Sequence, residues 1–236
     1  MTKQGDPIGQ AILDFQKSKK PADIIVKSDI CEDDIIPVEV LFRGLSEMPE
    51  LELQALNFVK GSVLDVGAGA GIHALELMDR GNKVLAIDTS TGAISHMKAM
   101  GINAVQQDFF DFEGGKFDTL LLLMNGVGIA GKLSNLEATL IHAKKLLNPG
   151  GKILCDSSDI KYLYEDEDGS LWIDLNTEYY GNFRFQMQYK TEKSEWFDWL
   201  YVDFDNLFQA AKNTGYKASK VYEMDDHYLA ELILVS

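Results

Sequence analysis

Hydrophobic positions along the chain change their spacing at three places, and each change predicts a different kind of structure. The first 60 residues carry apolar positions at helical spacing, as in Ile8, Ile12 and Phe15, with one acidic interruption. Short apolar runs then alternate with helical stretches, and a segment of strict polar–apolar alternation follows. We therefore expect three parts: an N-terminal helical cap at 1–60, an α/β core at 61–159 and 203–236, and an antiparallel β insertion at 160–202.

The core pattern predicts strands separated by helices. Five apolar runs have strand length, and they lie at residues 62–66, 83–88, 103–108, 117–124 and 152–156. The Asn-Pro-Gly-Gly sequence at 148–151 predicts a turn before the fifth of them. Helical crossovers between successive strands imply a parallel, doubly wound sheet, and two further strands are expected near the C-terminus.

The insertion predicts a β-hairpin rich in aromatic side chains. Residues 183–190 alternate with period two, and residues 195–204 form a second aromatic strand after a short turn. A third strand is expected at 171–175. Trp196, Trp199, Tyr179 and Tyr180 are either the wall of a pocket for a flat or cationic substrate, or part of the hairpin's own core or a dimer interface.

Composition and charge narrow the range of partners. The 236 residues are 46% hydrophobic and carry a formal net charge of −15. Such an acidic protein repels phosphate backbones, which makes nucleic acid a poor substrate. Its longest apolar run, Leu120–Met124, is too short to span a bilayer, and Cys31 and Cys155 form no disulfide framework. We expect a cytoplasmic protein that contacts no membrane and acts as a monomer or a homodimer.

The motif Leu64–Gly71, with the sequence LDVGAGAG, carries the strongest chemical signal. Its glycines allow positive φ and a close approach of a ligand to the backbone, at the N-terminus of the next helix. A dinucleotide site requires glycine or alanine where this chain has Ile72, which argues against NAD. Asp65 adds an acceptor immediately before the loop.

The pattern Asp-x-Gly-x-Gly-x-Gly resembles motif I of the class I, Rossmann-like S-adenosylmethionine-dependent methyltransferases. Residues 117–131 and 156–159 resemble a set of uncharacterised bacterial members, and the last strand resembles the antiparallel strand that closes the seven-stranded sheet of this class. The resemblance implies S-adenosyl-L-methionine as cofactor. It assigns cofactor contacts to Asp65, Gly67, Ala68, Gly69, Gly71, Asp88, Thr89, Asp108, Phe109 and Asn125, with Asp88 on the ribose, Asp108 and Phe109 at the adenine, and Asn125 beside the methyl-transfer site.

Methyl transfer from a sulfonium mainly requires alignment of donor and acceptor, and a general base is needed only when the nucleophile must lose a proton. Candidate catalytic groups are Asn125, His73 and Asp159. We expect no metal, because the carboxylates of Asp156 and Asp159 are too few for a hard cation. A small molecule is the expected acceptor. The alternatives are an NAD(P)-dependent oxidoreductase and a non-catalytic S-adenosylmethionine-binding module.

Overall fold

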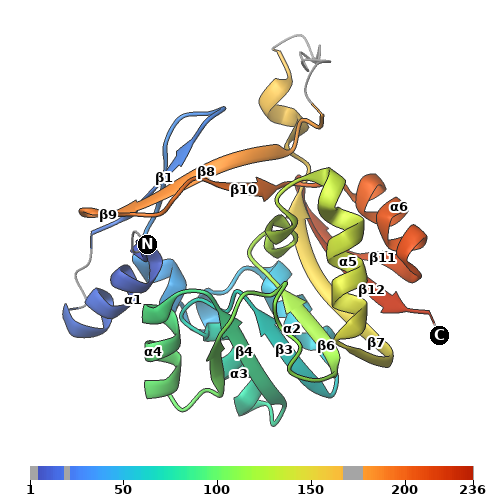
Figure 1. Cartoon of the computed structure of the whole chain (residues 1–236), viewed down its shortest axis with the longest axis horizontal. Helices are drawn as coiled ribbons and strands as arrows, with labels where there is room; N and C mark the ends of the chain where they lie inside the picture. Colours follow the sequence, from blue (N-terminus) through green and yellow to red (C-terminus); the bar gives the residue numbers. More distant parts are fainter. Residues whose placement is uncertain (1–4, 19–21, 167–177, 236) are drawn as a thin grey trace.

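Two β-sheets organise the chain, and they lie one above the other in the computed structural model (Figure 1). The structure describes residues 5–18, 22–166 and 178–235. Within them, seven strands form the larger sheet in the spatial order β11 (Tyr216–Met224), β12 (His227–Leu234), β7 (Leu147–Ser158), β6 (Phe117–Leu122), β3 (Ser62–Val66), β4 (Lys83–Asp88) and β5 (Ala104–Gln106). Strands β5, β4, β3, β6 and β7 pair in parallel, and β12 is antiparallel to both of its neighbours. The predicted α/β sheet is confirmed.

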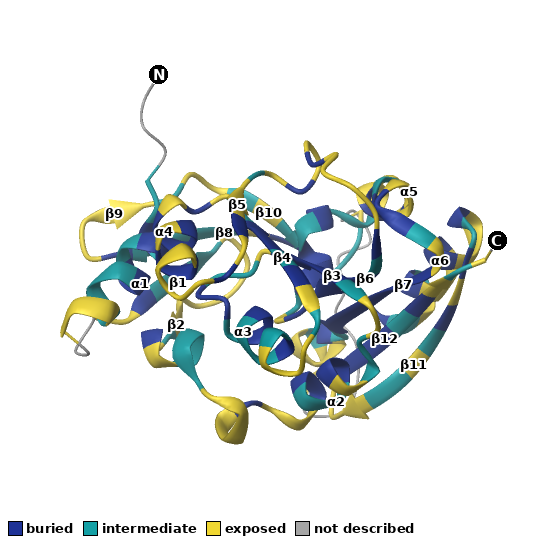
Figure 2. Cartoon of the chain, turned by 90° about the horizontal axis from the view of Figure 1, so that it is seen from below, coloured by how far each residue is buried: buried dark blue, intermediate teal, exposed yellow. Residues whose placement is uncertain are grey.

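Helices cover both faces of this sheet, and the α-helices beside it are α2 (Glu50–Phe58), α3 (Ile72–Asp79), α4 (Thr91–Ala99), α5 (Leu136–Lys145) and α6 (Phe204–Thr214). Successive strand residues enter opposite hydrophobic clusters: Leu120 packs with residues of α5 and α6, whereas Leu121 packs with residues of α2, α3 and α4. Figure 2 shows the resulting buried interior of the sheet between its two helical layers. The uninterrupted apolar runs of the central strands follow from burial on both faces.

The second sheet joins the two segments that sequence patterns separate from the core. Its strands are β10 (Phe197–Leu200), β8 (Asn182–Tyr189), β1 (Ile24–Ser28) and β2 (Asp34–Ile36), with β9 (Glu192–Lys193) beside β8. The antiparallel pairing of β8 with β10 confirms the hairpin. The third strand expected at 171–175 lies outside the described residues.

The N-terminal segment is not helical throughout, which corrects the expected helical cap. Helix α1 (Pro7–Ser18) and α2 are present, but β1 and β2 lie between them. The sequence Ile-Ile-Val of β1 is β-branched, and its pairing with β8, 157 to 163 residues further along the chain, determines its conformation. Short 3-10 helices connect the larger elements: η1 (Val38–Phe42), η2 (Leu45–Glu47), η3 (Gly126–Ala130), η4 (Leu133–Asn135) and η5 (Ile160–Tyr164).

The expected turn at 148–151 is also corrected, because these residues belong to β7. The strand begins at Leu147, and its register against β6 shifts between Phe117 and Thr119. Residues 148–151 form a bulge between the paired residues Leu147 and Lys152, and Gly150 within it has a φ of 72°.

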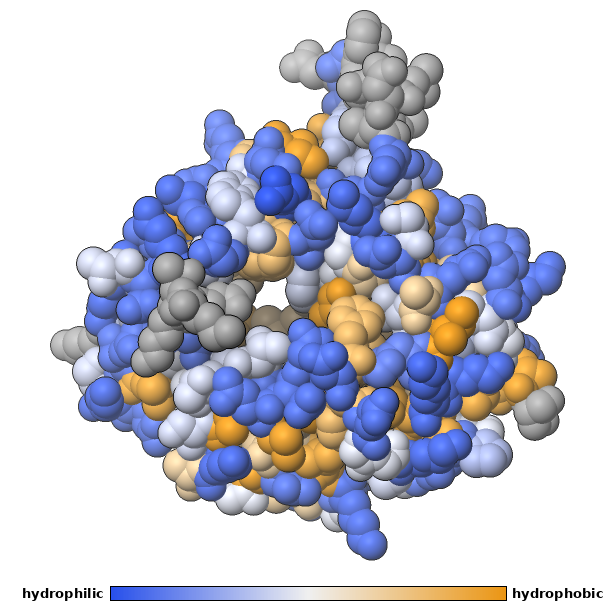
Figure 3. All heavy atoms as spheres, viewed as in Figure 1, coloured by the Kyte–Doolittle hydropathy of each residue, from blue (hydrophilic) through white to orange (hydrophobic). Residues whose placement is uncertain are grey.

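A cleft separates the two sheets. Figure 3 shows it as an opening in the space-filling view, at the place where Figure 1 has β8 above and the carboxyl ends of the parallel strands below. Helix α1 borders this cleft and packs on α4, where a Cβ added to Gly92 would lie 2.4 Å from the carbonyl oxygen of Gly9. The cleft lies at the edge of the sheet where open α/β folds bind ligands.

Candidate functional site at the carboxyl edge of the larger sheet

The glycine loop joins β3 to α3 and turns at three left-handed glycines. Gly67, Gly69 and Gly71 have φ values of 68°, 56° and 80°. The amides of Gly67 and Ala68 donate to the carbonyl oxygen of Ile87 in β4, which fixes the loop against the neighbouring strand. A Cβ at Gly67 or Gly69 would meet no atom within 4 Å, so the loop faces open space at these two positions.

The third glycine has a different environment, and substitutions test the difference. A Cβ at Gly71 would lie 2.7 Å from Ile102 Cδ1 and 2.8 Å from Met97 Cγ. We expect Gly71→Ala to lower the free energy of unfolding by about 2–4 kcal/mol, from overpacking and positive φ together. Gly69→Ala should cost about 1 kcal/mol, from φ alone, and should weaken S-adenosylhomocysteine binding instead. Urea denaturation and calorimetric titration of both variants check this, and equal stability losses would contradict it.

Asp65, at the end of β3, is a buried carboxylate with one unsatisfied oxygen. It is 2% exposed, and Oδ2 has no hydrogen-bond partner among the described residues. Burial raises the pKa of Asp65 to about 6; the nearby Asp88 contributes to the rise, while His73 and the amide of Ala74 oppose it. Such a group favours the arrival of a positive charge.

His73 does not stand free beside the glycine loop. Its Nε2 lies 2.7 Å from Glu52 Oε2, and both side chains are buried. Glu52 also accepts a hydrogen bond from Arg43, which donates a second one to the carbonyl oxygen of Val40 at 3.1 Å. Burial alone would raise the pKa of Glu52, but His73 and Arg43 outweigh it and lower that pKa. Sequence patterns did not single out Glu52, although an acid between Leu51 and Leu53 in an apolar stretch is the signal that was available.

Asp88 ends β4 and faces the glycine loop. Its Oδ2 accepts the amide of Gly69 at 2.9 Å, and its Oδ1 accepts the amide of Ser90 at 2.8 Å. Burial raises the pKa of Asp88, the two amides oppose the rise, and Asp6 of α1 adds to it. The neighbouring Thr89 is exposed. The structure thus brings Asp65, Asp88 and the glycines together, as the motif predicts.

Asp108 and Phe109 follow β5, and their side chains differ in burial. Asp108 is exposed, and its Oδ1 accepts the amide of Phe110 at 2.8 Å. The Phe109 ring is buried against His142, with ring centroids 4.9 Å apart, and His142 Nε2 lies 2.7 Å from the Phe109 carbonyl oxygen. Packing of the Phe109 ring into the core leaves Phe110, 46% exposed, as the more accessible ring of this turn.

Asn125 lies in a strained turn after β6. Met124 and Asn125 have φ values of 64° and 57°, which is uncommon for residues other than glycine and is often found at functional sites. The buried carboxylate of Asp156 accepts the amides of Asn125 and Gly126 at 3.0 and 3.2 Å. Ser158 Oγ donates to Asn125 Oδ1 at 3.1 Å. The charge-assisted bonds to Asp156 hold the turn in this conformation.

Asp159 belongs to a network that anchors the insertion to the core. Its Oδ1 accepts the hydroxyl of Tyr180 at 2.7 Å, and its Oδ2 lies 3.7 Å from Lys161 Nζ. Tyr179 donates to Asp203 at 2.6 Å. Burial and these carboxylates raise the pKa of both tyrosines, whereas the hydrogen bonds from Tyr179 and Asn206 outweigh burial and lower the pKa of Asp203. Tyr179 and Tyr180 are therefore engaged in this anchor.

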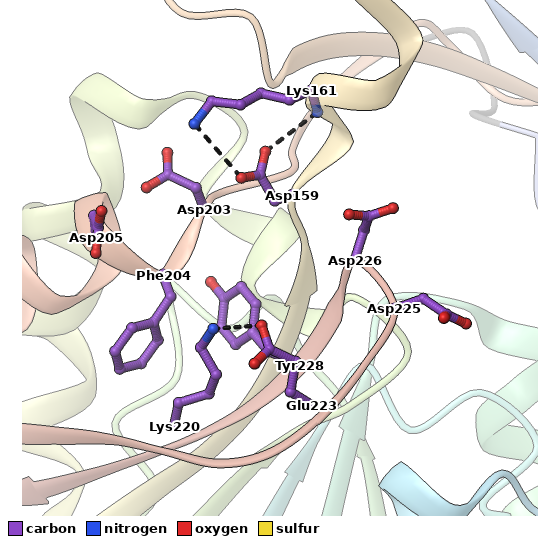
Figure 4. A pocket seen from close by; sticks show the side chains of 10 residues that line it. All are labelled: Asp159, Lys161, Asp203, Phe204, Asp205, Lys220, Glu223, Asp225, Asp226 and Tyr228. Atoms are coloured by element: carbon purple, nitrogen blue, oxygen red, sulfur yellow. Dashed lines mark hydrogen bonds and ion pairs between the residues drawn. The ribbon is translucent and has the colours of Figure 1, made fainter. Parts of the chain in front are cut away.

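A polar pocket lies beyond this anchor (Figure 4). Its lining residues are Asp159, Lys161, Asp203, Phe204, Asp205, Lys220, Glu223, Asp225, Asp226 and Tyr228. Despite the carboxylates, no three His, Cys, Asp or Glu side chains among the described residues are arranged to hold a metal ion.

The fold and the glycine loop define a class I methyltransferase architecture, and comparisons with known proteins agree. A model of the methyltransferase domain family matches residues 39–217, and the chain belongs to this family. A crystal structure of a SAM-dependent methyltransferase from Bacteroides fragilis, in complex with S-adenosyl-L-homocysteine, is 44% identical. It has a TM-score of 0.91, with 100% of this chain and 98% of that chain covered. The protein is an S-adenosylmethionine-dependent methyltransferase.

More distant relatives share the fold or part of the sequence. The sugar N-methyltransferase KedS8 from Streptoalloteichus sp ATCC 53650 is 15% identical, with a TM-score of 0.60, over 89% of this chain and 98% of that one. Cypemycin N-terminal methyltransferase from Streptomyces sp is 28% identical over 103 residues, which cover 42% of each protein. The match thus spans less than half of that relative's length. Among the described residues, no helix has the length and hydrophobicity to cross a membrane.

Proposed function

We propose that this methyltransferase alkylates a small-molecule acceptor bound in the cleft between its two sheets. The observation that supports this most directly is the cleft itself, which begins at the carboxyl edge of the parallel strands and is closed above by β8 and β10. An acceptor enclosed between two sheets is small. The net charge of −15 and the acidic pocket beside the anchor favour a cationic molecule, such as an amine, over a nucleic acid.

The residues at this edge fit the methyl donor. Open space above Gly67 and Gly69 admits a ligand against the backbone, and the unsatisfied Oδ2 of Asp65 would accept an ammonium group. Asp88 would accept the ribose hydroxyls, with Ala68, Gly71 and Thr89 beside it. Asp108 and Phe109 would border the adenine. When bound, the donor supplies a methyl group made electrophilic by its positively charged sulfur.

Asn125 would meet the reacting end of the donor. Its strained turn, held by Asp156, projects the residue from the end of β6 at the middle of the sheet. We propose a positioning role for Asn125 rather than proton transfer, because an amide side chain is a poor base. His73 and Asp159 remain candidates by position only, since His73 is buried and Asp159 is bonded to Tyr180.

The acceptor wall would come from the aromatic strands of the smaller sheet. Phe185 pairs directly with Phe197, and Phe183 with Trp199, so these four rings share one face. The Trp199 ring lies so close to Gly128 of η3 that an added Cβ would be 2.1 Å from it. This contact connects the aromatic face to the turn that carries Asn125.

We also propose a cytoplasmic location.

Ligand binding and transfer together test the function. S-Adenosylhomocysteine at 100 times its Kd should stabilise the folded chain by about 2.7 kcal/mol, whereas NAD and NADP should not. Labelled methyl groups from S-adenosylmethionine should appear in the small-molecule fraction of a bacterial extract. Stabilisation by NAD alone would refute the proposal, and binding without transfer would indicate a non-catalytic module.

A further inference from the structure

We infer that His227, oriented by the buried carboxylate of Asp156, accepts the proton that the methyl acceptor loses. This inference rests on the proposed function and adds to it a residue and an acceptor chemistry. The acceptor atom would be an amine or hydroxyl that carries a proton at neutral pH, rather than a thioether or another nucleophile that needs no base.

His227 and Asp156 form a close pair of unequal exposure. His227 Nε2 lies 2.8 Å from Asp156 Oδ2; the Asp156 side chain is 1% exposed and that of His227 is 35% exposed. A carboxylate at this distance favours the tautomer with the proton on Nε2, which leaves Nδ1 as an acceptor. No group among the described residues bonds Nδ1. The pair thus has the orienting acid and the accessible base of a proton-transfer dyad.

The His227 side chain lies on the side of β12 where Asp156 is, and not in the polar pocket. Both of its chain neighbours, Asp226 and Tyr228, line the polar pocket, and His227 does not (Figure 4). Because strand residues alternate between faces, His227 points to the opposite side. Its cross-strand partner there is Ser158, which donates to Asn125.

One carboxylate oxygen links His227 to the methyl-transfer turn. Asp156 Oδ2 accepts the amide of Asn125 at 3.0 Å as well as Nε2 of His227. The imidazole therefore lies within two hydrogen-bond lengths of the Asn125 backbone. Asp156 performs two tasks with one group: it holds the strained turn and it orients the ring.

Other side chains fit this role less well. His73 forms a similar pair with Glu52, but it is only 5% exposed, and His142 is bonded to the carbonyl oxygen of Phe109 in the turn after β5. Asp159 already accepts a hydrogen bond from Tyr180 and forms an ion pair with Lys161. His227 combines a free acceptor nitrogen, partial exposure and proximity to Asn125.

The step balances without a further reagent. The lone pair of the acceptor forms the bond to the methyl carbon, and the carbon–sulfur bond breaks with its electrons kept by sulfur. The proton of the acceptor passes to Nδ1 of His227, and the imidazolium formed is stabilised by the Asp156 carboxylate. Solvent removes the proton afterwards, because the ring is partly exposed.

His227→Gln tests the inference, since glutamine can keep a hydrogen bond to Asp156 but accepts no proton. Transfer of labelled methyl groups from S-adenosylmethionine to the small-molecule fraction of a bacterial extract should fall by about 10²-fold at neutral pH. The affinity for S-adenosylhomocysteine should not change. Met224→Gln is the matched control: it introduces the same side chain at the exposed residue paired with His227 across the two strands, and wild-type transfer is expected.

The pH profile and chemical rescue separate a base from a structural residue. Wild-type transfer should decrease towards acid pH, and His227→Gln should lack this decrease because glutamine accepts no proton. The charged groups around the hairpin are Asp156, Asp159, Glu223, Asp225 and Asp226, with Lys220 paired to Glu223, and the control variant keeps all of them. Added imidazole should restore transfer to His227→Ala.

The outcomes distinguish a failure of the His227 inference from a failure of the proposed function. Wild-type rate and pH profile in His227→Gln would overturn the inference, as would joint loss of transfer and S-adenosylhomocysteine binding in His227→Ala without imidazole rescue. Absence of transfer in the wild-type protein and the control alike would refute the proposed function itself, and with it this inference.

Discussion

Asp65→Asn should stabilise the free protein and weaken its binding of S-adenosylhomocysteine. The Asp65 carboxylate is buried, one of its oxygens has no partner among the described residues, and its pKa is raised to about 6 from 3.8. A carboxyl group with a raised folded-state pKa binds its proton more tightly in the folded chain, so stability falls as pH rises from about 4 to about 6. At pH 7 the two pKa values correspond to a cost of up to about 3 kcal/mol, which asparagine removes.

The same substitution removes the group that we propose to pair with the ammonium of the donor. Urea denaturation at pH 8 and at pH 4 should show a stability gain at the higher pH that largely disappears at the lower one. Asp118→Asn is a control of opposite sign, because hydrogen bonds from Ser62 and Asn148 lower the pKa of Asp118, and its contribution to stability is lost as pH falls. Unchanged stability of Asp65→Asn at pH 8, together with unchanged affinity, would contradict the assignment.

The opposed effects on stability and binding explain why a costly carboxylate stands at the end of β3. Sites that bind charged ligands keep groups that destabilise the empty protein, and the ligand compensates for them on binding. Glu52 is also a buried acid, but the cost of its burial is offset within the protein itself, by His73 and Arg43.

Sequence patterns located the larger sheet because its signals are local. Apolar runs bounded by turn residues identified the strands from 62–66 to 117–124, and the left-handed glycines of the loop were predicted from residue type alone. The smaller sheet was predicted only in part, because its strands pair with partners far away in the sequence. Ile24–Ser28 gains its partner from β8 across most of the chain, so its conformation depends on contacts that periodicity does not reveal.

The candidate site likewise has one part that a local sequence motif predicts and one part that only the folded sheet brings together. Asp65, Asp88 and the glycines follow one another along the chain within a single strand–helix–strand unit, and a short motif predicts them together. The pair of Asp156 and His227 is 71 residues apart and meets only through antiparallel pairing of β7 with β12. The sequence shows both residues at strand ends, but the register that joins them belongs to the folded sheet.

Asp88→Ala should weaken S-adenosylhomocysteine binding by about 10²-fold and leave the fold intact. A carboxylate that accepts two ribose hydroxyls contributes about 3 kcal/mol or more to binding, and 1.4 kcal/mol corresponds to a factor of ten in affinity. The fold should tolerate the change because Asp88 is a partly buried acid whose pKa is raised, so its loss also removes a desolvation cost. Calorimetric titration gives the affinity, and circular dichroism checks the fold.

Asp88 also holds the glycine loop through the amide of Gly69, so the loss of affinity has two sources that need to be separated. An analogue of S-adenosylhomocysteine without the ribose 2′-hydroxyl distinguishes them. If Asp88 binds the ribose, the alanine substitution should weaken the analogue far less than the parent compound, since non-additivity reports direct contact. Equal losses for both ligands would confine Asp88 to support of the loop, and unchanged affinity for S-adenosylhomocysteine would remove it from the site.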